Sequence, residues 1–353
     1  MSTDTGTVRQ SLNNDVMKLA ADYAQRYARE ISERRVAPSE AALAALADLH
    51  EPFPTSPSDA SDVIARLDQI GSPATMATTG GRYFGFVNGG MVPAALAANW
   101  LAAAWNQNAA LRVMSPIAAE LEEVVLRWVC EALGLPRECA GGLVTSATVA
   151  NFTALVSARH ALLARMGWDV TADGMFGAPP IEVIVGAEVH ASVSKALSLA
   201  GFGRKRVTIV EADGQGRMRA DKLPRLSERT IVCIQAGNVN TGAFDPAKEI
   251  CKAAKEHGAW VHVDGAFGLW ARISPKYKHL TKGFDQADSW PLTRISGPMS
   301  ATTAVWLSSE TALRCVRRWA LRLPIWNRVR AASLCITLLK PRDARGASSC
   351  GRR

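Results

Sequence analysis

The feature that most constrains the fold is a series of short apolar strands separated by helical segments between residues 142 and 265. Val and Ile dominate these strands without polar alternation, which is typical of strands that are covered on both faces. Helical patterns such as NFTALVSARHALLARMG lie between them. Strands alternating with helices predict a mainly parallel α/β sheet whose ligands bind at the carboxyl ends of the strands. The five predicted strands occupy residues 142–146, 181–186, 206–212, 230–236 and 259–265.

The residues before this series are predicted to be helical. Apolar positions recur at helical spacing over 14–35, and a shorter helix is expected around 63–70, after a connector rich in Pro and Ser. The apolar run at 91–105 is shorter than the roughly 20 residues that a membrane-spanning helix needs, so it predicts a buried helix. Residues 115–135 begin with Ser-Pro and end near Gly134, as capped helices do.

The net charge of +9 suggests nucleic-acid binding until its distribution is considered. Twelve of the 41 Lys and Arg residues, but only two of the 32 acidic residues, follow Trp290. Residues 1–290 therefore hold 29 basic and 30 acidic groups and are almost neutral. All of the excess positive charge lies in residues 291–353, so two different compositions meet at Trp290.

Cysteine usage and the N-terminus indicate the class of protein. The seven cysteines include no CxxC pair and have no cluster of histidines beside them, so the sequence predicts neither a disulfide framework nor a metal site. The first 17 residues contain no apolar segment of the kind found in secretory signals. The expected location is the cytoplasm.

A turn of small residues follows the first predicted strand. In TSATVAN (145–151), Ser146, Ala147 and Thr148 stand where a helix begins, and their N–H groups and hydroxyls suit a phosphate. Taken alone, the turn is better explained as the capped start of a helix without any ligand. The turn has neither GxGxxG nor GxxxxGK[ST], so it supports neither a dinucleotide site nor a P-loop.

Two further polar residues fall at predicted strand ends. His190 follows the second strand in AEVHASVSKA, and a single histidine in such a place is often structural. Asp264 ends the fifth strand in HVDGAFG, where a buried carboxylate needs a partner. Helix capping is one explanation for Asp264, and a cationic ligand group is the other. The small Gly265 and Ala266 leave space for a flat ring.

Together the three signals fit pyridoxal phosphate. The helix start at residues 146–148 would hold the phosphate, His190 would stack on one face of the ring and Ala266 would pack on the other. Asp264 would keep the pyridine nitrogen protonated, so that the ring accepts electrons from a developing carbanion.

Residues 1–290 resemble the pyridoxal-phosphate-dependent (group II) amino-acid decarboxylases, which include the aromatic-L-amino-acid and glutamate decarboxylases. The matching segments occur in the family's order: RYFGFVNGG, WNQN…SP…ELE, TSATVAN, VHAS, GNVNTGAFDP and HVDGAFG. The resemblance implies a type I PLP-dependent transferase fold (aspartate-aminotransferase-like). That fold has a mainly parallel seven-stranded sheet with helices on both faces and a preceding helical segment, here incomplete at the C-terminus.

The resemblance also implies roles for individual residues. It implies phosphate contacts from Ala147 and Thr148, ring stacking by His190, a pyridinium salt bridge from Asp264 and a cofactor contact from Asn238. Segments that approach the substrate in relatives correspond here to the stretches that contain Tyr83, Phe84, Gln107 and Asn108.

The lysine that relatives use to hold the cofactor as a Schiff base is missing. In the family it follows in a motif like DSW-x-x-DAHKW, whereas here ADSW is followed by PLTRISG, with Ser296 in place of the lysine. Codons for residues 290–297 can be chosen so that one G inserted after Trp290 encodes Trp-Ala-Ala-Asp-Ala-His-Lys-Trp. We therefore interpret residues 291–353 as an out-of-frame tail. A divergent basic tail that binds nucleic acid is the alternative.

These observations predict three segments: an N-terminal helical segment at 1–80, a partial cofactor-binding α/β domain at 81–290, and an aberrant, poorly ordered basic tail at 291–353. The implied activity is pyridoxal-phosphate-dependent decarboxylation of an L-amino acid by a homodimer, impaired here because the lysine is absent. Two other interpretations stay open: a non-catalytic partner of an intact paralogue, and another fold-type I lyase or transaminase.

Overall fold

The computed structural model describes residues 14–86, 88, 90, 92–293 and 303–307. Two compact units divide the chain between Leu101 and Ala102. The described part of the first unit ends at Leu101, and the second contains the remaining described residues.

The first unit is helical, as predicted. Helix α1 (Asn14–Glu30) packs against α3 (Ala60–Arg66), and one π-helical turn extends α3 to Gly71. The short α2 (Glu40–Ala44), two 3-10 turns (Ala45–Leu49 and Ser72–Ala74) and the part of α4 (Pro93–Trp105) up to Leu101 also belong to it. Ser39 caps α2 and Asp59 caps α3 by accepting backbone N–H groups, which supplies acceptors that a helix start lacks. Helices are therefore confirmed in both predicted places, but the first ends at Glu30 and does not continue to residue 35.

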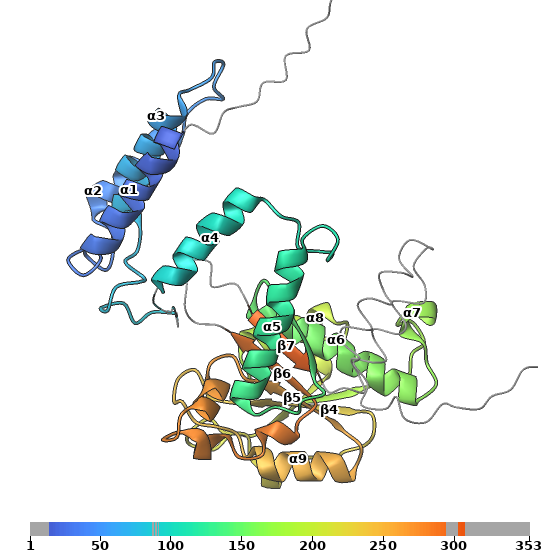
Figure 1. The fold of residues 1–353 in the computed structure, drawn as a ribbon. Helices are drawn as coiled ribbons and strands as arrows, with labels where there is room; N and C mark the ends of the chain where they lie inside the picture. Colours follow the sequence, from blue (N-terminus) through green and yellow to red (C-terminus); the bar gives the residue numbers. More distant parts are fainter. Residues whose placement is uncertain (1–13, 87, 89, 91, 294–302, 308–353) are drawn as a thin grey trace, which may run out of the picture. The chain divides into compact units, whose positions relative to one another are not determined.

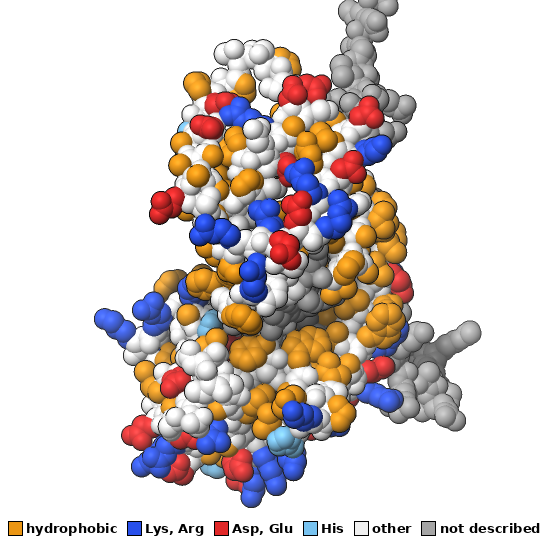
Figure 2. Space-filling view, turned by 90° about the vertical axis from the view of Figure 1, so that its left-hand side faces the viewer, with side chains coloured by type: hydrophobic (Ala, Val, Ile, Leu, Met, Phe, Trp, Pro, Cys, Tyr) orange, Lys and Arg blue, Asp and Glu red, His pale blue; other side chains and the backbone are white. Residues whose placement is uncertain are grey.

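Helix α4 (Pro93–Trp105) forms where the apolar run predicts a helix, but the prediction that it is buried is wrong. None of its residues is buried, and Trp100, Leu101 and Trp105 are 39%, 54% and 49% exposed. An apolar run indicates that a helix favours contact with other apolar surface, but it does not say where that surface comes from. In the view of Figure 2, hydrophobic side chains are exposed at the surface among charged ones.

Helix α5 (Pro116–Leu133) follows its predicted capping signals. The Ser115 hydroxyl accepts the N–H of Ala118 at 3.4 Å, and Gly134 ends the helix with φ of 58°, a conformation that glycine adopts without strain. Among the described residues, no helix is both long enough and apolar enough to cross a membrane.

The second unit contains a seven-stranded sheet with the order β1-β7-β6-β5-β4-β2-β3 (Figure 1). The pairs β2–β3, β2–β4, β4–β5 and β5–β6 are parallel, and β7 is antiparallel to both β1 and β6. The predicted α/β class and mainly parallel sheet are confirmed. The strands are β1 (Ala140–Val144), β2 (Glu182–Gly186), β3 (Val207–Val210), β4 (Thr230–Gln235), β5 (Trp260–Asp264), β6 (Ser289–Thr293) and β7 (Thr303–Leu307).

The helices α6 (Ala147–Arg165), α7 (Val170–Asp173), α8 (Ala191–Leu199) and α9 (Ala247–Glu256) connect these strands. Alternate residues of β4 belong to different core clusters: Ile231 and Cys233 pack with residues of α6 and α8, and Val232 and Ile234 with residues of α9. Both faces of the strand are therefore buried, which explains why its sequence lacks polar alternation.

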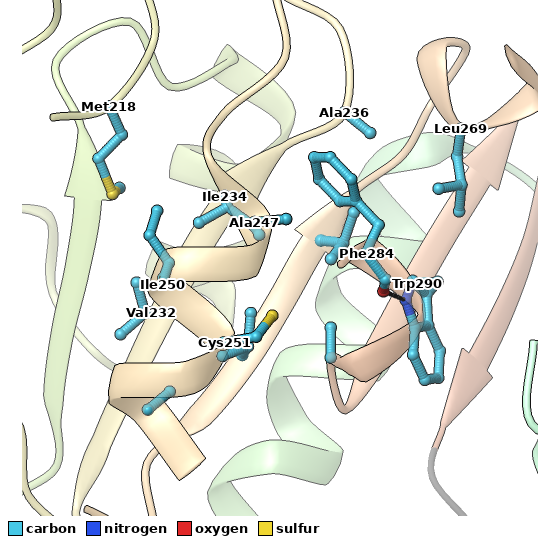
Figure 3. Close-up of a cluster of buried hydrophobic side chains, with 14 of the residues drawn as sticks. Met218, Val232, Ile234, Ala236, Ala247, Ile250, Cys251, Leu269, Phe284 and Trp290 are labelled. Carbon is cyan, nitrogen blue, oxygen red and sulfur yellow. Dashed lines mark hydrogen bonds between the residues drawn. The ribbon is translucent and has the colours of Figure 1, made fainter. Parts of the chain in front are cut away.

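The cluster on the α9 side contains several of the largest buried side chains (Figure 3). Trp290 is completely buried there, and its indole N–H donates to the carbonyl of Phe284 at 2.6 Å. Residues 291–293 complete β6, and residues 303–307 form β7. The predicted poor order of residues 291–353 stays a prediction, and most of that segment lies outside the described residues.

Candidate functional site

The carboxyl ends of six strands lie along one edge of the sheet. Strands β2, β3, β4, β5 and β6 run parallel, and β1 runs the same way as β6 because both are antiparallel to β7. Gln235 at the end of β4 pairs with Asp264 at the end of β5. The loops that contain most of the predicted site residues therefore leave the sheet at a common edge, where α/β proteins bind ligands.

Asp264 is the strongest electrostatic feature of this edge. Its side chain is buried, and among the described residues its carboxylate receives one hydrogen bond, from the N–H of Ala266 at 3.2 Å. Burial raises the pKa of Asp264 above its ordinary 3.8, while the Ala266 bond and the proximity of His190 act in the opposite direction. A buried carboxylate with so few partners is best stabilised by a cation, so its surroundings suit a protonated ring nitrogen.

His190 stands at the start of α8, directly after the loop that leaves β2. Its Nδ1 lies 2.8 Å from the hydroxyl of Ser192 and accepts the Ser192 backbone N–H at 3.2 Å. The ring is exposed, and it is close enough to Asp264 to affect the pKa of that carboxyl. The structure thus brings His190 and Asp264 together, although they are far apart in the sequence.

The turn between β1 and α6 has the form that a phosphate site requires. Ser146 is the N-cap of α6, and its hydroxyl accepts the N–H of Val149 at 3.2 Å. The N–H groups of Ala147 and Thr148 belong to the first turn of a 19-residue helix, where the helix itself supplies no acceptor. These N–H groups and the helix dipole favour an anion at this point.

Asn238 is buried and holds two loops together. Its amide N–H donates to Glu188 at 2.7 Å, and its amide oxygen accepts the N–H groups of Asn240 and Thr241. Gln235 ties the same loops because its side-chain amide donates to the carbonyl of Glu188 at 3.0 Å. Asn238 therefore fixes the loop after β4 against the loop after β2, and its contact with a cofactor stays a prediction.

Sequence reasoning missed Thr293 at the end of β6. Its backbone N–H donates to the carbonyl of Ala266 at 2.8 Å, which places it beside the turn that follows Asp264. Its side-chain oxygen is buried and has no hydrogen-bond partner among the described residues. A lone threonine in the sequence gives no sign of such a role. A buried hydroxyl without a partner is unusual in a folded protein, and this one lies next to the turn that follows Asp264.

The predicted substrate residues are not assembled around this edge by any described contact. Tyr83 and Phe84 belong to the first unit, where Phe84 is 91% exposed. Gln107 and Asn108 belong to the second unit and are exposed, with local hydrogen bonds to the Trp105 carbonyl and from the Ala110 N–H. Their roles stay predictions. Ser296, at the position of the missing lysine, lies outside the described residues.

Comparison with known proteins identifies relatives of this arrangement. The model of a family described as "Pyridoxal-dependent decarboxylase conserved domain" matches residues 44–315. Acidic amino acid decarboxylase GADL1 of Mus musculus is 31% identical over 239 residues, which are 65% of this chain and 42% of the relative. Cysteine sulfinic acid decarboxylase of Homo sapiens is 29% identical over 220 residues, 59% of this chain and 43% of the relative. This chain thus spans about two fifths of the length of these curated relatives.

Solved structures share the fold. The apo form of mouse CSAD is 24% identical and superposes with a TM-score of 0.75 over 86% of this chain and 66% of the other. The structure of Oryza sativa TDC with PLP and tryptamine is 24% identical and has a TM-score of 0.76 over 86% of this chain and 69% of the other. The type I fold predicted from the sequence is confirmed by these neighbours.

Proposed function

Since the chain belongs to the pyridoxal-dependent decarboxylase family, we propose that its second unit binds pyridoxal phosphate at the carboxyl edge of the sheet. The cofactor of this family is pyridoxal phosphate. The observation that most supports the proposal is Asp264, a buried carboxylate whose one hydrogen bond from the described residues is long. The aldehyde cofactor has a ring nitrogen that becomes cationic when protonated, and such a cation stabilises a carboxylate in this position.

Each predicted residue has a separate task in this proposal. The first-turn N–H groups at Ala147 and Thr148 hold the phosphate, and the imidazole of His190 stacks on the ring. Ala266 packs against the opposite face of the ring with its methyl group. Asp264 keeps a proton on the ring nitrogen. When bound, the cofactor accepts the electrons that remain at the α-carbon of an L-amino acid when its carboxylate departs as CO₂.

We propose that this chain carries out that decarboxylation poorly. The family's reaction needs a lysine amine to hold the cofactor and to move protons, and Ser296 stands in its place. The recovered DAHKW motif in a shifted frame supports an out-of-frame origin for residues 291–353. The described stretches 291–293 and 303–307 still complete the sheet, so the loss concerns chemistry more than folding.

The homodimer and the cytoplasmic location implied by the resemblance remain part of the proposal. The exposed apolar side chains of α4, among them Trp100 and Trp105, offer a surface that a second copy of the chain would cover.

Titration of the purified chain with pyridoxal phosphate tests the cofactor proposal. We expect binding without a linkage that borohydride fixes, and almost no CO₂ release from amino acids. Asp264→Asn should weaken binding roughly 10- to 100-fold, because a charge-assisted hydrogen bond is lost. Asp221→Asn is the control, since Asp221 is an exposed carboxylate paired with Arg219.

A chain encoded with the single base restored after Trp290 completes the experiment. It should form the borohydride-fixable linkage and release CO₂. Equal affinity of the original chain and Asp264→Asn for the cofactor would contradict the proposed site. Steady decarboxylation by the original chain would contradict the proposed impairment.

A further inference from the structure

A series of hydrogen-bonded polar side chains connects His190 to the core of the second unit. The Ser192 hydroxyl, 2.8 Å from His190 Nδ1, accepts the amide N–H of Asn151 at 3.1 Å. The amide oxygen of Asn151 lies 2.9 Å from Nε2 of His262. Ser192 is 6% exposed, and Asn151 and His262 are completely buried. Burial of this kind is unusual for an imidazole and an amide unless each polar atom has a partner.

The series of hydrogen bonds continues from β5 to β6. His262 Nδ1 lies 3.0 Å from the hydroxyl of Ser289, its neighbour on the adjacent strand. The same hydroxyl accepts the indole N–H of Trp260 at 3.0 Å. The connected side chains thus come from α8, α6, β5 and β6. Those elements also adjoin the ring-stacking histidine, the phosphate turn, Asp264 and the segment where relatives have their lysine.

The contacts at His190 determine which group donates and which accepts in each hydrogen bond. The backbone N–H of Ser192 donates to His190 Nδ1, so that nitrogen has no proton and the Ser192 hydroxyl also donates to it. The Ser192 oxygen is then an acceptor, which fits the amide N–H of Asn151. The Asn151 oxygen in turn needs a donor, so the proton of His262 is on Nε2.

The far end is compatible with this direction. Burial lowers the pKa of His262 to about 3, so the ring is neutral, and with its proton on Nε2 its Nδ1 accepts the Ser289 hydroxyl. The Ser289 oxygen is left to accept, and its remaining neighbour, the Trp260 indole, is a group that only donates. The far end therefore fits the direction set at His190, and no donor faces a donor along this series of side chains.

We propose that Asn151 and His262 are positioning residues for His190: through Ser192 they fix the plane of its ring and hold its single proton on Nε2. The inference rests on the proposed stacking of His190 on the cofactor and deepens it. With Nδ1 occupied by two donors, Nε2–H is the polar group of the ring that has no partner among the described residues, and it can present a hydrogen-bond donor to the ligand edge. A ring left free to rotate would have to be ordered when the ligand binds, which weakens binding.

The substitution Asn151→Asp tests this with little change in volume. An aspartate keeps the acceptor for His262 but replaces the donor to Ser192 with a second acceptor, so the Ser192 hydroxyl turns its proton away from His190. Ser192→Ala removes the hydroxyl itself and provides a second test if Asn151→Asp fails to fold. Ser157→Ala is the matched control, because Ser157 is also 6% exposed and its hydroxyl donates to the Thr153 carbonyl, outside the chain of polar side chains.

The main readout is nitrogen NMR of the histidine rings in the ligand-free, ¹⁵N-labelled protein. We expect His190 in the original chain to be protonated at Nε2 alone. Asn151→Asp and Ser192→Ala should shift the tautomer ratio by roughly 5-fold, the equivalent of one net hydrogen bond. Cofactor affinity, measured by quenching of tryptophan fluorescence, should fall by a similar factor. Ser157→Ala should change neither quantity.

The two readouts separate this inference from the proposed function. A proton on Nδ1 of His190 in the original chain, or an unchanged tautomer ratio in folded Asn151→Asp and Ser192→Ala, overturns the inference even if the cofactor binds. A shifted ratio with unchanged cofactor affinity overturns the positioning role. Failure of every protein, the original included, to bind the cofactor refutes the proposed function, while the tautomer ratio still decides whether the polar side chains orient His190.

Discussion

Replacing Gly268 with alanine should disturb the candidate site, because the added methyl group has no room beside the end of β4. Gly268 begins the 3-10 turn Gly268–Ile273 that follows β5. A Cβ at this position would lie 1.9 Å from the carbonyl oxygen of Ala236, 2.5 Å from its carbon and 2.9 Å from the Cα of Gly237. All three obstacles are backbone atoms, so no side-chain rotation relieves the clash.

The size of the effect follows from these distances. To reach a separation of about 3 Å, the turn after β5 and the end of β4 must move apart by roughly 1 Å, and overpacking of this kind typically costs about 1–3 kcal/mol. Because backbone must shift, we expect a loss at the upper end, about 3 kcal/mol. That corresponds to a decrease in Tm of roughly 6–10 °C. The same shift would separate the turn after Asp264 from the loop at Asn238 and weaken cofactor binding.

Gly142→Ala, in β1, is the matched control in the same unit. Among the described residues, a Cβ at Gly142 meets no atom within 4 Å, so this variant should be neutral or up to about 1 kcal/mol more stable. Urea denaturation followed by far-UV circular dichroism would compare the two variants with the original chain. If Gly268→Ala lies within about 0.5 kcal/mol of Gly142→Ala, the packing argument is wrong.

Two further predictions concern the core and its pH dependence. Burial raises the pKa of Asp245 to about 6 from 3.8, so its ionised carboxylate opposes folding at neutral pH. The unfolding free energy should therefore rise by up to about 3 kcal/mol as pH falls from 7 towards 4. Asp245→Asn should remove that rise, which urea denaturation at several pH values would measure. Trp290→Phe should lower the free energy of unfolding by roughly 2–4 kcal/mol in the same assay, because it leaves a void and removes the donor to the Phe284 carbonyl. Trp270→Phe is the control: its indole is half-buried, so the loss should be smaller.

The parts of the fold that could be predicted from the sequence are those in which local pattern and burial agree. Strand β4 was predictable because both of its faces are buried, so TIVCIQ contains one apolar residue after another. Strand β6 was not, because Pro291 lies within it and a proline is unexpected in an internal strand. The carbonyl of Pro291 nevertheless accepts the N–H of Gly265. The strand therefore holds the turn after Asp264 through the backbone acceptor that a proline still has.

The candidate site divides in the same way. Asp264 and His190 were predictable because acidic and imidazole groups at strand ends are conspicuous against apolar strands. Asn151 and His262 were not, because one lies inside a helix and the other inside a strand, where a sequence pattern marks them only as polar interruptions. Their significance comes from a hydrogen bond between positions that only the tertiary fold brings together.

The groups proposed to bind the cofactor and the amine that performs the chemistry belong to different parts of the sequence. The groups proposed to hold the phosphate, the ring face and the ring nitrogen follow β1, β2 and β5, all of which precede Trp290. Trp290 is itself completely buried and closes the core on the α9 side. After it, Pro291 and Thr293 hold the turn after Asp264 through backbone hydrogen bonds, and β7 joins β1 to β6. A change of frame directly after Trp290 that keeps these two strands would remove the amine that performs the chemistry while leaving the ligand-holding edge folded. On this argument, cofactor affinity and catalytic turnover should separate in this chain, because the loss of the lysine lowers turnover more than affinity.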